Sequence, residues 1–151
     1  MSLRLHLKPH EKIILGGAVI KCGSNPANFT VENNSVPILR QKDIMTEADA
    51  TTPAKRIYFV LQLMYIDNDS SSPAYRELFA GLEQEMLAAA PSSQRYFVEI
   101  GDCIASGRLY RALKIAQELI GYEEQLIAQA GALPAVHHHQ AVDAQTSAVS
   151  P

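Results

Sequence analysis

Two neighbouring stretches decide the fold of this chain: LRQKDIM at residues 39–45 and ATTPAKRIYF at residues 50–59. In the second stretch, the hydroxyl of Thr52 is suited to cap a helix. Pro53 is suited to the first helical position, where its missing N–H costs nothing. We therefore predict that a helix begins at Pro53. Strand-like alternation comes before this junction and helical periodicity comes after it, so the junction joins a β-rich part to a helical part.

Four of the thirteen basic residues lie at the junction. Lys55 and Arg56 fall in the first turn of the predicted helix, where a cation opposes the helix dipole. A bound phosphate would account for this placement, because helix N-termini bind anions. Arg40 and Lys42 come just before them along the chain. Asp43 is expected to pair with Arg40 and Lys42 or to cap the local turn.

The residues before the junction have the pattern of short strands. Leucines at positions 3, 5 and 7 share one predicted face of a first strand, and the other face carries Arg4, His6 and Lys8. Gly16-Gly17 tolerates positive φ and predicts a two-residue hairpin turn. We expect five short strands in an antiparallel meander, at residues 2–8, 12–15, 18–21, 29–32 and 36–39.

From Pro53 onward the period is helical. The first helix is apolar on nearly every side, so we expect it to be buried between the sheet and the other helices. The second carries an apolar stripe that includes Leu78, Phe79 and Met86. Gly107 either separates the last two helices or bends a single long one. The expected helices span residues 53–65, 74–89, 93–105 and 109–129.

A chain of 151 residues suits one domain of ordinary size. We predict an α+β fold in a single domain over residues 1–130, with a β-rich part at 1–45 and a helical part at 46–130. Residues 131–151 have no apolar period and predict a disordered tail. The two cysteines lie in different parts of the chain and are expected to be reduced and buried: Cys22 and Cys103.

Composition and motifs exclude several classes of function. The apolar runs are too short to span a membrane. The N-terminal residues lack the continuous apolar core of a signal peptide, which favours a cytoplasmic protein. The chain has no Gly-rich phosphate loop, Cys-x-x-Cys pair or nucleophile elbow, so we expect no catalytic site and no cofactor. The adjacent His137, His138 and His139 are poorly arranged for a closed site, so we expect no metal.

The net charge of −3 is unevenly divided. Residues 1–56 contain eight basic and five acidic residues, whereas residues 57–151 contain five basic and eleven acidic ones. A polyanion would therefore meet the first third of the chain and the helix start. The alternative is a solvated, charged strand face without a ligand, and few aromatic residues lie near enough to stack bases. We predict an RNA-binding surface made of Arg4, Lys8, Arg40, Lys42, Lys55 and Arg56.

The two stretches at the junction resemble the signature of the FlbT family, bacterial regulators of flagellin synthesis that act on flagellin mRNA. The resemblance covers roughly residues 2–127 in the right order and spacing. Its further blocks are LKP at 7–9, EK at 11–12, GAV at 17–19, MY at 64–65 with Asp67, DCI at 102–104, Tyr110, AL at 112–113, LI at 119–120 and YE at 122–123.

The resemblance implies a post-transcriptional regulator that binds the 5' untranslated region of flagellin mRNA and represses translation or promotes decay. Some members of the family promote flagellin expression, and the residues do not distinguish the two signs. Nor do they distinguish direct RNA contact from contact through a second protein. The rival hypothesis is a protein-interaction or chaperone-like module that binds flagellin or another flagellar regulator through its helices. Exposed sheet edges leave homo-oligomer formation open.

Overall fold

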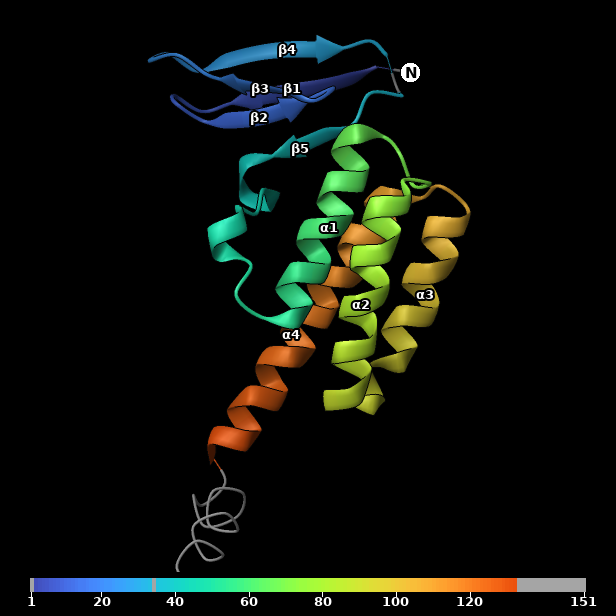
Figure 1. Cartoon of the computed structure of the whole chain (residues 1–151). Helices are drawn as coiled ribbons and strands as arrows, with labels where there is room; N and C mark the ends of the chain where they lie inside the picture. The colour runs from blue at the N-terminus through green and yellow to red at the C-terminus, as the bar shows by residue number, and fades with distance from the viewer. Residues whose placement is uncertain (1, 34, 133–151) are drawn as a thin grey trace, which may run out of the picture. The chain divides into compact units, whose positions relative to one another are not determined.

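The computed structural model describes residues 2–33 and 35–132. The chain divides into two compact units, residues 1–119 and 120–151, and each is treated by itself. The described part of the first unit contains all the strands, three helices and the beginning of a fourth (Figure 1). In the second unit, residues 120–132 form the last part of the fourth helix. The predicted α+β class is confirmed, since antiparallel strands precede four helices.

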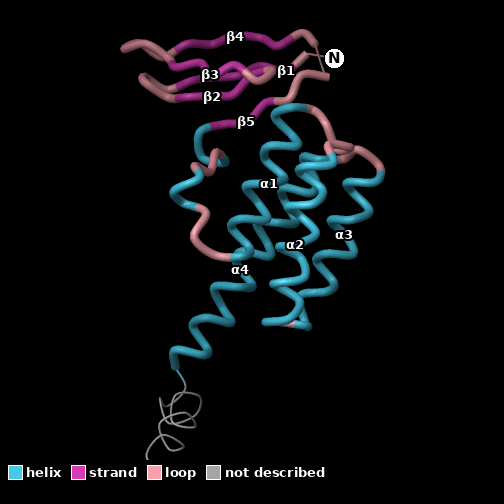
Figure 2. The backbone as a smooth tube through the Cα atoms, viewed as in Figure 1, coloured by secondary structure: helices cyan, strands magenta, loops and turns pink. Residues whose placement is uncertain are grey.

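The described strands form two small antiparallel sheets (Figure 2). Strand β1 pairs with β4, and β2 pairs with both β3 and β5. The predicted meander is therefore wrong in its pairing, because in the described chain β2–β3 is the one pair of consecutive strands. At that hairpin, Gly16 and Gly17 have φ of 59° and 88°, as the turn requires. The strands span Leu3–Leu7 (β1), Lys12–Leu15 (β2), Ala18–Lys21 (β3), Ala27–Val31 (β4) and Ile38–Arg40 (β5).

The pairing follows from how the strands bury their apolar side chains. Leu5 and Leu7 of β1 form one hydrophobic cluster with Ile13 of β2 and with Cys22. Strands β1 and β2 thus belong to different sheets and meet through their side chains in this cluster. Both cysteines are free and buried, as predicted.

The helices begin and end close to the predicted positions. Thr52 caps α1 by accepting a hydrogen bond of 3.3 Å from the N–H of Lys55. Gly107 separates the last two helices, because its φ of 75° ends α3 in the left-handed region. The helices span Pro53–Asp67 (α1), Pro73–Ala89 (α2), Gln94–Ala105 (α3) and Leu109–Ala132 (α4), and short 3₁₀ turns lie at Gln41–Asp43 (η1), Glu47–Asp49 (η2) and Pro91–Ser93 (η3).

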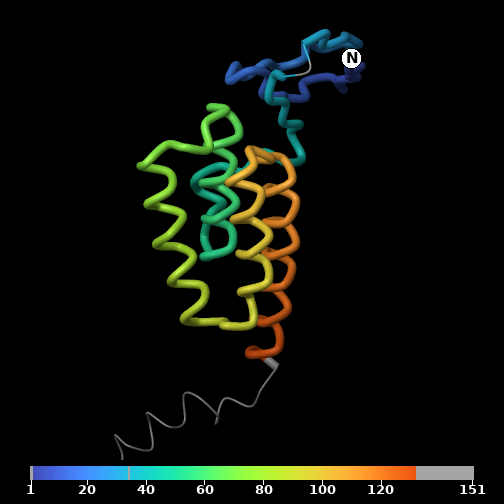
Figure 3. The backbone as a smooth tube through the Cα atoms, turned by 90° about the vertical axis from the view of Figure 1, so that its right-hand side faces the viewer, coloured from blue at the N-terminus to red at the C-terminus, as the bar shows by residue number. Residues whose placement is uncertain are grey.

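Helix α1 supplies much of the helical core, and Ile57, Leu61 and Met64 have no exposed surface. Helices α1 and α2 pack against each other (Figure 3). The rings of Phe79 in α2 and Phe97 in α3 meet edge to face. The predicted stripe of α2 is wrong at Leu78, which is 54% exposed. Its neighbour Phe79 turns into the core instead, since adjacent helical positions point about 100° apart.

The expected tail, residues 131–151, lies outside the described residues except for positions 131 and 132, which end α4. The three adjacent histidines, and the prediction about them, also lie outside. Across the described ranges, no helix is both long enough and apolar enough to cross a membrane.

Candidate nucleic-acid interface

A polar stripe on α1 determines where the junction segment lies. Between its charged ends this helix is largely apolar, but successive turns carry polar side chains at positions i, i+4 and i+7, which share one face. All three hydrogen-bond to backbone groups of residues 38–45, a segment that includes the LRQKDIM stretch. The three are Tyr58, Gln62 and Tyr65.

Two members of the stripe each make a reciprocal pair of hydrogen bonds. The Tyr65 hydroxyl donates to the carbonyl of Ile38 at 3.0 Å and accepts from the Ile38 N–H at 2.9 Å. The Gln62 amide donates to the carbonyl of Met45 and accepts from the Met45 N–H, both at 2.8 Å. The helix therefore satisfies backbone groups at the start of strand β5 and in the segment that follows it.

Asp43 is joined to the helices. Its carbonyl accepts a hydrogen bond from the Tyr58 hydroxyl, whose pKa is raised to about 12 by burial. One carboxylate oxygen accepts from Gln117 Nε2 at 3.2 Å, and the other lies 4.0 Å from Lys114 Nζ. The expected pairing with the nearby junction cations is therefore wrong. The carboxylate turns inward, with 11% of its side chain exposed, toward one cation, Lys114, and one amide, Gln117, both of α4.

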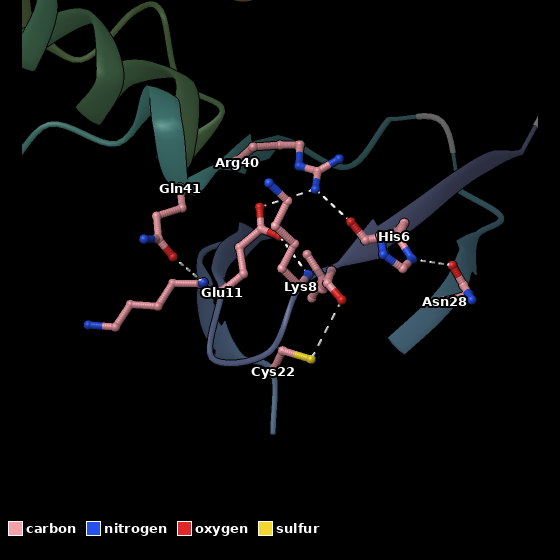
Figure 4. Close-up of polar contacts among 9 residues, drawn as sticks. His6, Lys8, Glu11, Cys22, Asn28, Arg40 and Gln41 are labelled. Atoms are coloured by element: carbon pink, nitrogen blue, oxygen red, sulfur yellow. Dashed lines mark hydrogen bonds and ion pairs between the residues drawn. The ribbon is translucent and has the colours of Figure 1, made fainter. Parts of the chain in front are cut away.

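Arg40 is partly committed to the fold. One of its terminal nitrogens, Nη2, donates to the carbonyl of His6 at 2.7 Å and to the carboxylate of Glu11 at 3.1 Å (Figure 4). The N–H of Lys8 also donates to Glu11, at 2.9 Å. This backbone hydrogen bond and the Arg40 contact hold the pKa of Glu11 below its usual value. The charge of Arg40 is therefore partly balanced before any ligand binds.

The other predicted cations of the β-rich part lie on or beside an exposed polar face. Arg4 and His6 of β1 stand opposite Thr30 and Asn28 of β4, and all four are exposed. His6 Nδ1 lies 2.7 Å from the side-chain oxygen of Asn28. Lys8 follows directly and is also exposed. We call Arg4, His6, Asn28 and Thr30 the polar face of β1–β4.

The six predicted RNA-binding residues do not form one surface. Lys55 and Arg56 lie in the first turn of α1, whereas Tyr65, which contacts β5, is ten residues further along that helix. Ten residues of α-helix span about 15 Å. Lys42 is exposed in η1, between these two regions in sequence. The structure thus separates a strand group, Arg4, Lys8 and Arg40, from a helix-start group, Lys55 and Arg56.

Two further cations, missed in the sequence analysis, face each other across the β2–β3 hairpin. Lys12 and Lys21 are direct partners in the register, and both are exposed. Like charges at this position repel. The predicted turn at Gly16-Gly17 already determined this pairing, because strands around a two-residue turn pair symmetrically. Among residues 2–33 and 35–132, no cluster of three or more His, Cys, Asp or Glu side chains is placed to hold a metal ion.

Comparison with known proteins identifies the family. Residues 3–127 match the family described as "Flagellar protein FlbT". The chain belongs to the FlbT family. No solved structure matches it.

Several relatives cover most of the chain. A "Probable flagellum biosynthesis repressor protein FlbT 1" of Bradyrhizobium diazoefficiens is 43% identical over 85% of this chain and 87% of the relative. A "Probable flagellum biosynthesis repressor protein FlbT" of Rhodopseudomonas palustris is 41% identical over 85% of this chain and all of the relative. The "Flagellum biosynthesis repressor protein FlbT" of Caulobacter vibrioides is 36% identical over 83% and 89%. The predicted family is thereby confirmed, and it is a family of flagellar regulators.

Proposed function

We propose that this FlbT-family chain is a post-transcriptional regulator of flagellin synthesis. It binds the 5' untranslated region of flagellin mRNA in the cytoplasm and represses translation or promotes decay. The names of the relatives support a role in repressing flagellum biosynthesis. The observation that carries RNA binding is the exposed polar face of β1–β4, where Arg4 lies beside hydroxyl, amide and imidazole groups. Such groups contact phosphates and 2'-hydroxyls.

The two groups of cations would contact different parts of the RNA, one from β1 and the other from the start of α1. Arg4 and Lys8 would contact the RNA backbone along β1. Lys55 and Arg56 would contact phosphates at the start of α1, where the positive end of the helix dipole adds to the attraction. Arg40 would contribute less, because Glu11 already balances part of its charge. An RNA that reaches both groups must extend along α1 or fold around it. The role is binding, and it needs no chemistry on the RNA.

A second candidate function is supported by exposed apolar side chains on the helices. Leu78 in α2 is 54% exposed and Val98 in α3 is 57% exposed. Beside Leu78, a shallow hollow is lined by Ala74, Gly81 and Leu82. Such surfaces suit a protein partner, here flagellin or another flagellar regulator. In addition, β3 is at an end of its sheet with all four residues exposed, which provides an edge for self-association.

A pull-down that scores bound RNA and bound flagellin together separates these functions. Tagged chain is recovered from flagellated cells in three forms: the wild type, Arg4→Ala with Lys8→Ala, and Leu78→Ser with Val98→Ser. We expect the wild type to enrich flagellin leader RNA, and the basic-residue variant to lose it while the apolar-residue variant retains it. Recovery of flagellin with no leader RNA, lost in the apolar-residue variant, would establish the protein-interaction function instead.

A further inference from the structure

A cavity of about 570 Å³ lies in the first unit, next to the polar face of β1–β4. Its apolar lining comes from both parts of the chain, and includes Leu3 and Val31 from the paired strands β1 and β4 and Tyr65 from α1. Tyr110, at the start of α4, completes it. The volume is within the range of about 300–1,000 Å³ found for ligand sites. We call this cavity the tyrosine cleft.

Two of its features are unusual for a hydrophobic core. Leu3 is 48% exposed and Tyr110 is 45% exposed, so the lining is open to a ligand. The rings of Tyr65 and Tyr110 lie with centroids 5.7 Å apart and planes tilted by 48°. The Tyr65 ring is fixed, because its hydroxyl makes two hydrogen bonds to Ile38. The cleft therefore presents one fixed aromatic ring and one accessible aromatic ring.

Positively charged side chains lie near these two rings. Arg4 and Arg40 line the cleft itself. Lys114 Nζ lies 5.0 Å from the centroid of the Tyr110 ring. A second cavity lies on the polar face of β1–β4 and is lined by Arg4, His6 and Thr30. Arg4 lines both cavities. Aromatic rings bordered by cations, beside a polar strand face, suit a ligand with flat rings joined by phosphates.

We propose that the tyrosine cleft binds an unpaired base of single-stranded RNA, with a flanking phosphate on Arg4. This inference rests on the proposed function and specifies the form of RNA. An unpaired base can enter the cleft and stack on Tyr110, whereas a base within a duplex cannot leave its stack without cost. Arg40 is already paired with Glu11, but a wholly apolar peptide would offer no counter-charge to Arg4, the other arginine of the cleft, which favours the nucleotide as occupant.

The test compares Tyr110→Ala, Tyr110→Phe and Tyr96→Ala in the full chain. The probes are flagellin leader RNA, a 12-nucleotide single-stranded oligoadenylate, and that oligoadenylate annealed to its complement. We expect Tyr110→Ala to weaken single-strand binding roughly 5- to 150-fold, the effect of losing one base stack. Tyr110→Phe keeps the ring and should stay within about twofold of wild type. Tyr96→Ala, which removes a ring of α3 outside the cleft, should do the same. The duplex should bind more weakly than the single strand.

The salt dependence separates the base from the phosphates. Tyr110→Ala should leave the salt slope unchanged, whereas Arg4→Ala should reduce it by about 0.7. Photocross-linking of a 4-thiouridine-containing leader RNA to the wild-type chain provides a second reading that needs no variant. We expect cross-links in peptides that contain Tyr65 or Tyr110.

Failure of the cleft and failure of the proposed function give different results. If the wild type binds leader RNA but Tyr110→Ala binds it equally well and the cross-links fall elsewhere, the cleft proposal is wrong and the proposed function stands. If Tyr110→Ala loses flagellin protein and keeps its RNA affinity, the cleft is a protein site and the proposal is wrong. If the wild type binds none of the RNA probes, both the cleft proposal and the proposed RNA-binding function are wrong.

Discussion

The side-chain amide of Gln62 and the backbone of Met45 exchange two hydrogen bonds, each 2.8 Å long. Gln62 is 3% exposed, in the middle of an otherwise apolar helix. A buried amide is tolerated in such a place because both its donor and its acceptor are satisfied. Its partner segment, residues 41–45, has little regular structure beyond the η1 turn. Gln62 therefore attaches the junction to α1.

Replacing Gln62 with leucine tests this attachment. Gln62→Leu introduces an apolar side chain of similar size and leaves the N–H and carbonyl of Met45 without their partner. Each such group costs about 1–3 kcal/mol when it is fully buried. Because two groups are affected and Met45 is only partly buried, we expect the free energy of unfolding, measured by urea denaturation, to fall by about 2 kcal/mol. Gln84→Leu is the matched control, because Gln84 is exposed on α2 and the change should stay within about 0.5 kcal/mol. Equal effects of the two changes would show that the Gln62 pair contributes nothing specific.

Core truncations on α1 should differ according to burial. Leu61 has no exposed surface, so Leu61→Ala should cost about 2–5 kcal/mol in the free energy of unfolding. Phe59 is half-buried, in contrast to the sequence expectation of a helix enclosed on nearly every side. Phe59→Ala should therefore cost roughly half of what a fully buried phenylalanine would. Denaturation of the two variants under one set of conditions gives the comparison, and a larger loss for Phe59→Ala would contradict the packing of α1.

Replacing glycine with alanine should have opposite effects on stability at two positions. Gly107→Ala should destabilise the chain by about 1–2 kcal/mol, because φ at this position is 75° and an added Cβ favours negative φ. Gly81→Ala should stabilise it by about 0.5–1 kcal/mol, because Gly81 is inside α2 and an added Cβ would meet no atom within 4 Å. Thermal denaturation of both variants measures the difference. A stabilising Gly107→Ala would mean that α3 and α4 are not separated by a left-handed residue.

The hydrogen bonds to Glu11 predict a dependence of stability on pH. The folded chain holds the pKa of Glu11 below its usual 4.5, so the unfolded chain takes up the proton first as the pH falls. The stabilisation is therefore complete above about pH 4.5 and is lost as the pH falls through the lower, folded value. Glu11→Gln should be less stable than wild type at neutral pH, with the gap narrowing on acidification. Glu77→Gln, at an exposed position on α2, should show no such narrowing.

Local sequence signals predicted where helices and strands begin and end. They did not predict which strands, distant in sequence, pair with each other. Thr52 and Pro53 gave the start of α1, and Gly16-Gly17 gave the β2–β3 hairpin with its register. Alternation, however, tells which residues share a face and not which strand lies beside which. The β1–β4 pair was missed for that reason.

The candidate site shows the same limit. The pairing of Asp43 with Lys114 depends on where α4 lies, and nothing near Asp43 in sequence predicts it. The i, i+4, i+7 spacing of Tyr58, Gln62 and Tyr65 was visible in the sequence, but its partners could be identified only from the fold. The six cations were grouped because the charged face of the first strand and the junction were expected to form one surface, an expectation that ignores the length of α1 between Lys55 and β5.

The most direct test of RNA binding is the affinity of the full chain for flagellin leader RNA between about 50 and 200 mM salt. Three double variants are compared with wild type: Arg4→Ala with Lys8→Ala, Lys55→Ala with Arg56→Ala, and, as the control, Arg76→Ala with Arg108→Ala on the acidic helical part. We predict that each of the first two weakens binding and lowers the slope of log affinity against log salt by about 0.7 per lost contact, while the control changes neither. Binding with unchanged affinity and slope in both of the first two variants would contradict the account.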